Sequence, residues 1–133
     1  MKTLITILFS MLVKKRNKIW ITNPLKTQNK TFKKLLKKGM NTQFGLDHNF
    51  SSIKSYEDFK NQVPIRDYEG LKPYVDKVVS GEKNILWPGQ PLYFAKTSGT
   101  TSGIKYIPIT KESILTHINS ARDALLNYFL KTN

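Results

Sequence analysis

The sequence predicts an α/β fold in which several helices precede a short β-hairpin built around a Ser/Thr/Gly-rich loop. Three observations predict it. Apolar residues recur at helical spacing in much of the first half of the chain and again after residue 110. Gly or Pro stands where the periodic stretches of the first half end. Two short apolar segments flank the polar loop, which is the pattern of two strands joined by a turn.

Residues 1–22 are predicted to form a basic amphipathic helix. The apolar run from Leu4 to Val13 is about half the ~20 residues that cross a bilayer, and no small-x-small cleavage site follows it. A cluster of Lys and Arg follows the run, which favours retention in the cytoplasm. An amphipathic helix is therefore preferred, while peripheral membrane contact and a true signal peptide stay open as alternatives. The expected apolar face carries Ile5, Leu8, Phe9, Leu12 and Ile19.

Cap and stop signals predict three further helices. Asn before Pro is a typical helix start, and Ser followed three positions later by Asp resembles a capping box. Gly and Pro are typical helix ends. Residues 40–54 are interpreted as a loop. The predicted helices run from Asn23-Pro24 to Gly39, from Ser55 to Pro64 and from Asp67 to Gly81.

Residues 92–109 are predicted to form a strand, a loop and a second strand. The turn at 86–89, with the sequence LWPG, leads into the first strand over 92–96, and the second strand covers 106–109. A final helix over 110–131 is expected to begin after Thr110 as its cap. Its apolar face is formed by Ile114, Ile118, Ala121, Leu125 and Phe129.

The net charge of +13 resembles that of a nucleic-acid-binding protein until it is mapped along the chain. Half of the 22 Lys and Arg residues lie in residues 1–46, which contain no Asp or Glu. The basic character therefore belongs to the first third, where the lysines at positions 30–38 are interpreted as a solvated helix face. A basic module within residues 1–38 that binds RNA or an anionic membrane is the alternative function.

Cysteine and histidine usage excludes several kinds of site. The chain contains no Cys, so it has neither a disulfide framework nor a thiol nucleophile. His48 and His117 do not fit a metal-binding spacing, and we interpret them as a polar loop residue and a helix-surface residue. No metal ligand is assigned.

The segment with most chemical information is the loop that runs from Thr97 to Lys105. Seven consecutive residues are Gly, Ser or Thr, and Lys105 follows two positions after them. Small residues let backbone N–H groups approach a polyphosphate, hydroxyl groups can donate to its oxygens, and a lysine supplies positive charge. The pattern from Gly99 is G-x3-G-x-K, which is neither a Walker A loop nor GxGxxG.

The order SGTTSG-x-KYIPIT over residues 98–110 resembles the phosphate-loop region of the acyl-acid amido synthetases, the auxin-responsive family of the adenylate-forming superfamily. It departs from the superfamily pattern TSGTTGxPKG because Gly103 lies one position later and Ile104 replaces proline. The resemblance covers about residues 25–131. Its other segments are Phe44–His48, Tyr56–Phe59, Val63–Tyr68, Leu86–Gly89 and Ala121–Ala124.

The resemblance implies a ligase. Family members use ATP to convert a carboxylic acid into an acyl-adenylate and pyrophosphate, and an amine or amino acid then displaces AMP to form an amide. Residues 1–133 would be an incomplete portion of the large N-terminal domain of such an enzyme, with its C-terminal domain absent. This portion is expected to be inactive alone.

The resemblance also assigns roles to the loop. It implies ATP and Mg²⁺ as cofactors, a small carboxylic acid and an amine as substrates, and a cytoplasmic location, with neither a nucleic-acid partner nor a stable membrane anchor. No catalytic residue is assigned, and Ser98 is not interpreted as a nucleophile because no His lies near it in sequence. Phosphate contacts are expected from Ser98, Thr100, Thr101 and Ser102, close backbone approach at Gly99 and Gly103, and charge from Lys105.

Overall fold

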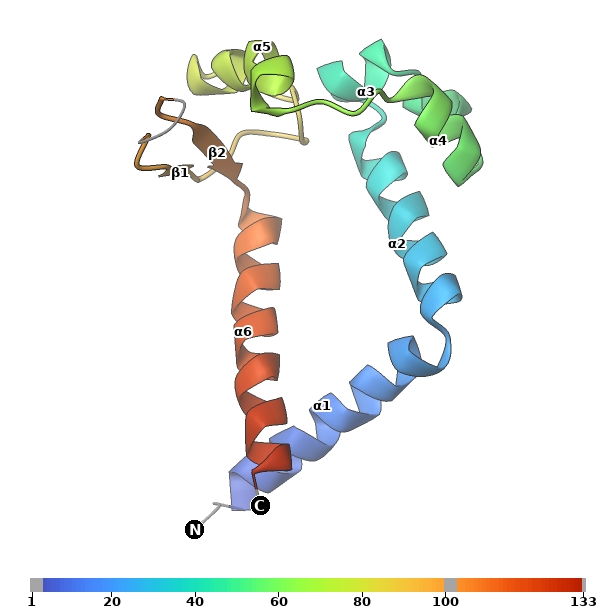
Figure 1. Cartoon of the computed structure of the whole chain (residues 1–133), viewed down its shortest axis with the longest axis vertical. Helices are drawn as coiled ribbons and strands as arrows, with labels where there is room; N and C mark the ends of the chain where they lie inside the picture. Colours follow the sequence, from blue (N-terminus) through green and yellow to red (C-terminus); the bar gives the residue numbers. More distant parts are fainter. Residues whose placement is uncertain (1–3, 100–102, 133) are drawn as a thin grey trace. The chain divides into compact units, whose positions relative to one another are not determined.

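The computed structural model describes residues 4–99 and 103–132. These residues form six α-helices, one 3-10 helix and one two-stranded antiparallel sheet (Figure 1). The predicted combination of helices with a short β-hairpin is present, and the described fold is mostly helical. The chain divides into two compact units, Met1–Thr31 with Glu112–Asn133, and Phe32–Lys111.

The first unit contains α1 (Leu4–Thr22), the first half of α2 (Pro24–Gly39) and most of α6 (Lys111–Lys131). Ser10 and Val13 of α1 are buried. Asn17 lies on the same helix face, since it follows Val13 by four positions. Its Nδ2 donates to Oδ1 of Asn127 in α6 at 3.2 Å. This face of α1 therefore packs within the unit.

The buried face of α1 is not the one that the apolar pattern predicts. Leu8, Phe9, Leu12 and Ile19 are each about half exposed or more. The helix is apolar around most of its circumference between Leu4 and Val13, so spacing alone does not select one side. The predicted stripe of α6 is also largely open, with Ile118 60% and Leu125 56% exposed.

The second unit contains the end of α2, α3 (Gln43–Asp47), the 3-10 helix η1 (Phe50–Ser52), α4 (Tyr56–Gln62) and α5 (Tyr68–Val79). The predicted start of α4 is confirmed. Ser55 Oγ accepts from the Asp58 N–H at 3.1 Å, and Asp58 Oδ2 accepts from the Ser55 N–H at 2.9 Å, which completes a capping box. The start of α5 is confirmed too, because Asp67 Oδ1 accepts from the Gly70 N–H at 2.8 Å.

The interpretation of residues 40–54 as a loop is wrong, because α3 and η1 lie within this range. Thr42 caps α3 and is only 1% exposed. Its Oγ1 donates to the Gly39 carbonyl at 2.6 Å and accepts from the Gly45 N–H at 3.1 Å. One hydroxyl therefore joins the end of α2 to the start of α3. The five-residue helix that Thr42 starts is too short to show a period in the sequence.

The core of the second unit combines aliphatic residues with a row of aromatic rings. Leu36, Ile53, Val75, Val78 and Ile85 are buried. The rings follow one another edge to face or tilted at centroid distances of 5.1–6.2 Å, a spacing that is favourable for aromatic pairs. They connect α2, α4, η1, α3 and α5 in that order through Phe32, Phe59, Phe50, Phe44 and Tyr74.

The lysines of α2 at positions 30, 33, 34, 37 and 38 are all exposed. Lys37 and Lys38 lie in the last turn, where the helix dipole favours positive charge. This arrangement agrees with a solvated face. No helix among residues 4–99 and 103–132 is long and apolar enough to cross a membrane.

Candidate functional site

The Ser/Thr/Gly loop connects β1 (Tyr93–Lys96) to β2 (Tyr106–Ile109), which pair antiparallel with Lys96 opposite Tyr106. Two hydrogen bonds extend the pairing beyond the strands. The Thr97 N–H donates to the Lys105 carbonyl at 3.1 Å, and the Lys105 N–H donates to Thr97 Oγ1 at 3.1 Å. Thr97 and Lys105 therefore close the base of the hairpin.

The structure places four of the seven residues that the sequence assigns to phosphate contact: Ser98, Gly99, Gly103 and Lys105. The assignments of Thr100, Thr101 and Ser102 lie outside the described residues. Ser98 is exposed at the start of the loop, so its hydroxyl is accessible to a ligand.

The two glycines are required by the path of the backbone. Gly99 has φ of +72° and Gly103 has φ of +79°, which is the left-handed region that glycine adopts without steric cost. A Cβ on Gly99 would lie 3.1 Å from the Gly103 carbonyl carbon and 3.1 Å from the Ile104 nitrogen. The two limbs of the loop thus approach each other closely at Gly99, whereas the space beside Gly103 is open.

Lys105 lies against the ring of Tyr68, the first residue of α5. Its Nζ is 5.4 Å from the ring centroid, within the range of a cation–π interaction. The hydroxyl of the same Tyr68 accepts from the N–H of Tyr106 at 2.9 Å. The sequence pattern does not predict this role for Tyr68, since 37 positions separate it from Lys105. Its position at a capped helix start was the only local signal.

The charge of the hairpin suits an anion. Residues 91–110 include Lys96 and Lys105 and no Asp or Glu. Hydroxyl, ammonium and glycine N–H groups are the donors that phosphate oxygens accept. These residues therefore fit a polyphosphate. Among residues 4–99 and 103–132, no group of three or more His, Cys, Asp or Glu is placed to hold a metal ion.

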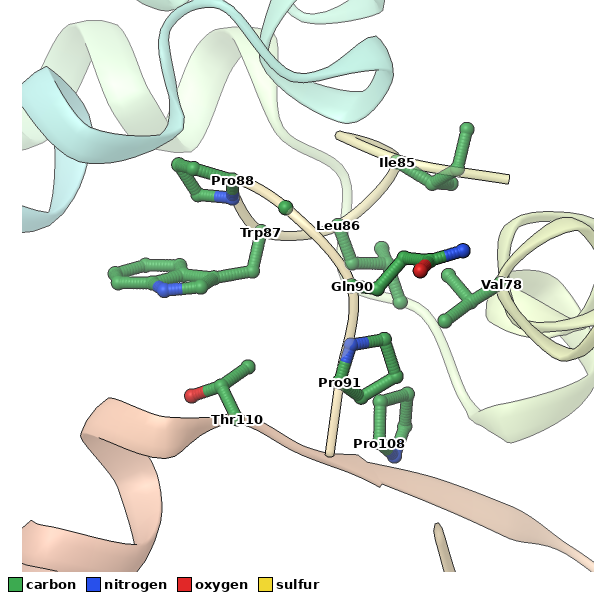
Figure 2. A pocket seen from close by; sticks show the side chains of 10 residues that line it. Val78, Ile85, Leu86, Trp87, Pro88, Gln90, Pro91, Pro108 and Thr110 are labelled. Atoms are coloured by element: carbon green, nitrogen blue, oxygen red, sulfur yellow. The ribbon is translucent and has the colours of Figure 1, made fainter. Parts of the chain in front are cut away.

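A small pocket lies beside the hairpin and is almost entirely apolar (Figure 2). The turn of residues 85–91 forms one wall, and Val78 of α5, Pro108 of β2 and Thr110 complete it. Asn84 stabilises this turn, since its Oδ1 accepts from the Gly89 N–H at 2.7 Å. No lining residue is charged, so the pocket offers no attraction for phosphate.

A second polar cluster surrounds His48, which is buried at 5% exposure. His48 lies in the turn after α3, as expected of a loop residue, but it is buried. Its Nδ1 lies 2.7 Å from the Phe44 carbonyl, and its Nε2 lies 2.9 Å from Arg66 Nη1. Since a guanidinium can only donate, Nε2 accepts and Nδ1 carries the proton. His48 thus links α3 to the segment before α5. His117 is exposed on α6, as expected.

Asp47 and Tyr74 form a second link between α3 and α5. The Tyr74 hydroxyl donates to Asp47 Oδ2 at 2.8 Å, and the Gln43 side-chain amide donates to Oδ1 at 2.7 Å. These hydrogen bonds hold the pKa of Asp47 below its ordinary value of 3.8, and the bond from Tyr74 has the largest effect. Burial, and then the bond to Asp47, raise the pKa of Tyr74 above its ordinary value of 10.0.

The Tyr74–Asp47 bond is expected to stabilise the fold between about pH 4 and pH 10. Asp47 has a lowered pKa in the folded state, so its contribution is lost as pH falls through that pKa. Tyr74 has a raised pKa, so its contribution is lost as pH rises through it. The free energy of unfolding in urea should therefore differ most between wild type and Tyr74→Phe near neutral pH, and the two values should converge in acid. A loss of stability in Tyr74→Phe that does not depend on pH would contradict this expectation. An equal loss in Tyr56→Phe, which changes an exposed tyrosine, would contradict it too.

Sequence comparison identifies the family. The profile of the GH3 family N-terminal domain matches residues 15–133. The chain belongs to the GH3 family. The resemblance inferred from the loop and the upstream segments is thereby confirmed, and the hairpin lies inside the matched region of this GH3 chain.

Curated GH3 relatives are similar over part of their length. An indole-3-acetic acid-amido synthetase of Arabidopsis thaliana, GH3.2, is 28% identical over 94 residues, which cover 69% of this chain and 17% of the relative. The jasmonoyl–L-amino acid synthetase JAR6 of Nicotiana attenuata is 30% identical over 89 residues, which cover 65% of this chain and 15% of the relative. The A. thaliana indole-3-acetic acid-amido synthetase GH3.17 is 35% identical over 63 residues, which cover 46% of this chain and 10% of the relative. The matches thus span less than a fifth of these relatives.

Proposed function

We propose that this chain supplies the polyphosphate-binding loop of an ATP-dependent acyl-acid amido synthetase. The observation that carries the proposal is the closed hairpin at Thr97 and Lys105, which holds an exposed hydroxyl, two left-handed glycines and an ammonium group beside one loop. Membership of the GH3 family and relatives named as amido synthetases support it.

In the proposed reaction, bound ATP supplies an α-phosphorus that a substrate carboxylate attacks, with pyrophosphate leaving, and an amine then displaces AMP from the acyl carbon. The residues of this chain bind and orient the β- and γ-phosphates. Ser98 donates its hydroxyl, Gly99 and Gly103 present backbone N–H groups, and Lys105 offsets negative charge. We propose hydroxyl contacts from Thr100, Thr101 and Ser102 as well. Mg²⁺ is assigned to no residue of this chain.

The substrates are proposed by class: a small carboxylic acid and an amine or amino acid. Loop residues that contact only phosphates do not select either one. The chain is proposed to need the remaining segments of a synthetase for turnover, so residues 1–133 alone should form no amide. The alternative of a basic RNA- or membrane-binding module stays a prediction, and exposed lysines on α2 are explained by solvation.

The products of ATP consumption test the reaction type. A complete polypeptide carrying this chain would be incubated with ATP, an amino-acid mixture, and indole-3-acetic acid, jasmonic acid or benzoic acid in turn. Acid-dependent release of AMP and pyrophosphate together with an amide is the expected result. Release of ADP and inorganic phosphate would contradict adenylation, because it would place the attack at the γ-phosphorus.

A further inference from the structure

Tyr68 is held firmly beside the base of the hairpin. It is the first residue of α5, directly after the cap Asp67, whose carboxylate accepts from the Gly70 N–H at 2.8 Å. Further along the helix, Val75 and Val78 are buried in the core of the second unit. The Tyr68 side chain is itself half-buried. A capped and packed helix end therefore presents this ring.

Tyr68 contacts two consecutive residues with different parts of its side chain. Its hydroxyl accepts from the Tyr106 N–H at 2.9 Å, and its ring lies 5.4 Å from Lys105 Nζ. Successive N–H groups in extended backbone point to opposite sides. The Lys105 N–H accordingly points to Thr97, and the Tyr106 N–H points away from β1 to Tyr68.

These contacts restrict both the backbone and the side chain of Lys105. Lysine has a flexible four-carbon stem, and ordering its ammonium at a phosphate costs conformational entropy. A ring against the ammonium lowers this cost, because part of the ordering precedes binding. Lys96 lies at the other side of the hairpin base and is exposed. It is therefore a matched control with the same charge.

We propose that Tyr68 is a positioning residue that holds the Lys105 ammonium at the phosphate loop. The role of Lys105 rests on the function proposed above, whereas the contact between the ring and the ammonium does not. Tyr68 acts through Lys105 and does not touch the nucleotide. The hydroxyl fixes the start of β2, and the ring fixes the side chain.

The first test needs no ligand. In the full 133-residue chain labelled with ¹³C-lysine, the side-chain protons of Lys105 should resonate upfield, because they lie over an aromatic face. Lys105→Arg assigns the signal. The upfield shift of the Lys105 side-chain protons should persist in Tyr68→Phe and disappear in Tyr68→Leu. The Lys96 resonances should not change in either variant. An ordinary Lys105 shift in wild type, or a displaced one unchanged in Tyr68→Leu, would overturn the proposal.

The second test measures ATP affinity in the complete polypeptide by calorimetry. Tyr68→Leu should weaken binding about two- to fivefold, the size of a partly exposed cation–π contact, and Tyr68→Phe should weaken it less. In a Lys105→Ala background, Tyr68→Leu should have no further effect. Equal losses in both backgrounds would mean that Tyr68 has only a structural role and would overturn the proposal.

The two tests separate failure of the positioning role from failure of the proposed function. If Lys105→Ala leaves ATP affinity unchanged, the phosphate assignment of Lys105 is wrong. The lysine resonances then still decide whether Tyr68 positions Lys105. If Lys105→Ala weakens binding and the Tyr68 effect is independent of it, the function stands and the positioning role is wrong.

Discussion

Replacing Lys105 by alanine is expected to weaken ATP binding by the complete polypeptide about 10- to 100-fold. A hydrogen bond that involves a charged group contributes about 1.5–3 kcal/mol, and about 1.4 kcal/mol corresponds to a factor of ten. The backbone of Lys105 closes the loop through Thr97, and its ammonium lies over the ring of Tyr68. Isothermal titration calorimetry with ATP measures the effect.

The control for this prediction is Lys96→Ala, which removes the same charge from the exposed end of β1. It should change ATP affinity far less than Lys105→Ala. The loss for Lys105→Ala should also be larger for ATP than for AMP, which lacks the β- and γ-phosphates. Thr100→Ala is expected to weaken ATP binding in the same selective way. Equal effects of the two lysine variants would reduce Lys105 to a source of general positive charge.

The second large effect is expected from Gly45→Ala, which should destabilise the second unit by about 3 kcal/mol or more. A Cβ at Gly45 would lie 2.0 Å from the Gly39 carbonyl oxygen and 3.1 Å from Met40 Cα. Both obstacles are backbone atoms, so no side-chain rotation relieves the overlap. Gly45 is buried, and the neighbouring Thr42 hydroxyl already donates to the same carbonyl. Urea unfolding followed by circular dichroism measures the loss.

Gly70→Ala is the matched control, because Gly70 also lies in the first turn of a helix with its N–H bonded to the cap residue. The nearest atoms to a Cβ there would be Arg66 Cβ at 3.1 Å and Arg66 Cγ at 3.4 Å, a much milder approach than the 2.0 Å at Gly45. Alanine also favours helix over glycine by about 1 kcal/mol. Gly70→Ala should therefore change stability much less than Gly45→Ala. A Gly45→Ala chain as stable as wild type would show that α2 and α3 are less tightly joined than described.

The elements that could be predicted from sequence are those specified by neighbouring residues. Ser55 and Asp67 each accept from a helix N–H three positions later. Pro24 begins α2, as the Asn-Pro pair predicts. The two strands were predicted from short apolar segments on either side of a Gly-rich loop and begin within one residue of expectation. Local chemistry was sufficient in these cases.

The features that sequence reasoning missed depend on contacts between distant positions. His48 is buried because Arg66 donates to it across 18 positions, and the buried face of α1 is the one that carries Asn17, which bonds to Asn127 across 110. Tyr68 meets Lys105 only after α5 packs against β2. The candidate loop was predicted from composition and family resemblance, whereas the residue that supports its lysine follows only from the fold.

The most direct test of the account is hydrogen–deuterium exchange in the complete polypeptide with ATP or AMP at saturation. The account predicts that ATP slows amide exchange in the peptide spanning residues 97–105, since the β- and γ-phosphates accept from these N–H groups. AMP should leave that peptide nearly unchanged. Equal protection by the two nucleotides, or ATP protection confined to the lysine face at residues 30–38, would contradict the assignment of this hairpin as the polyphosphate-binding loop.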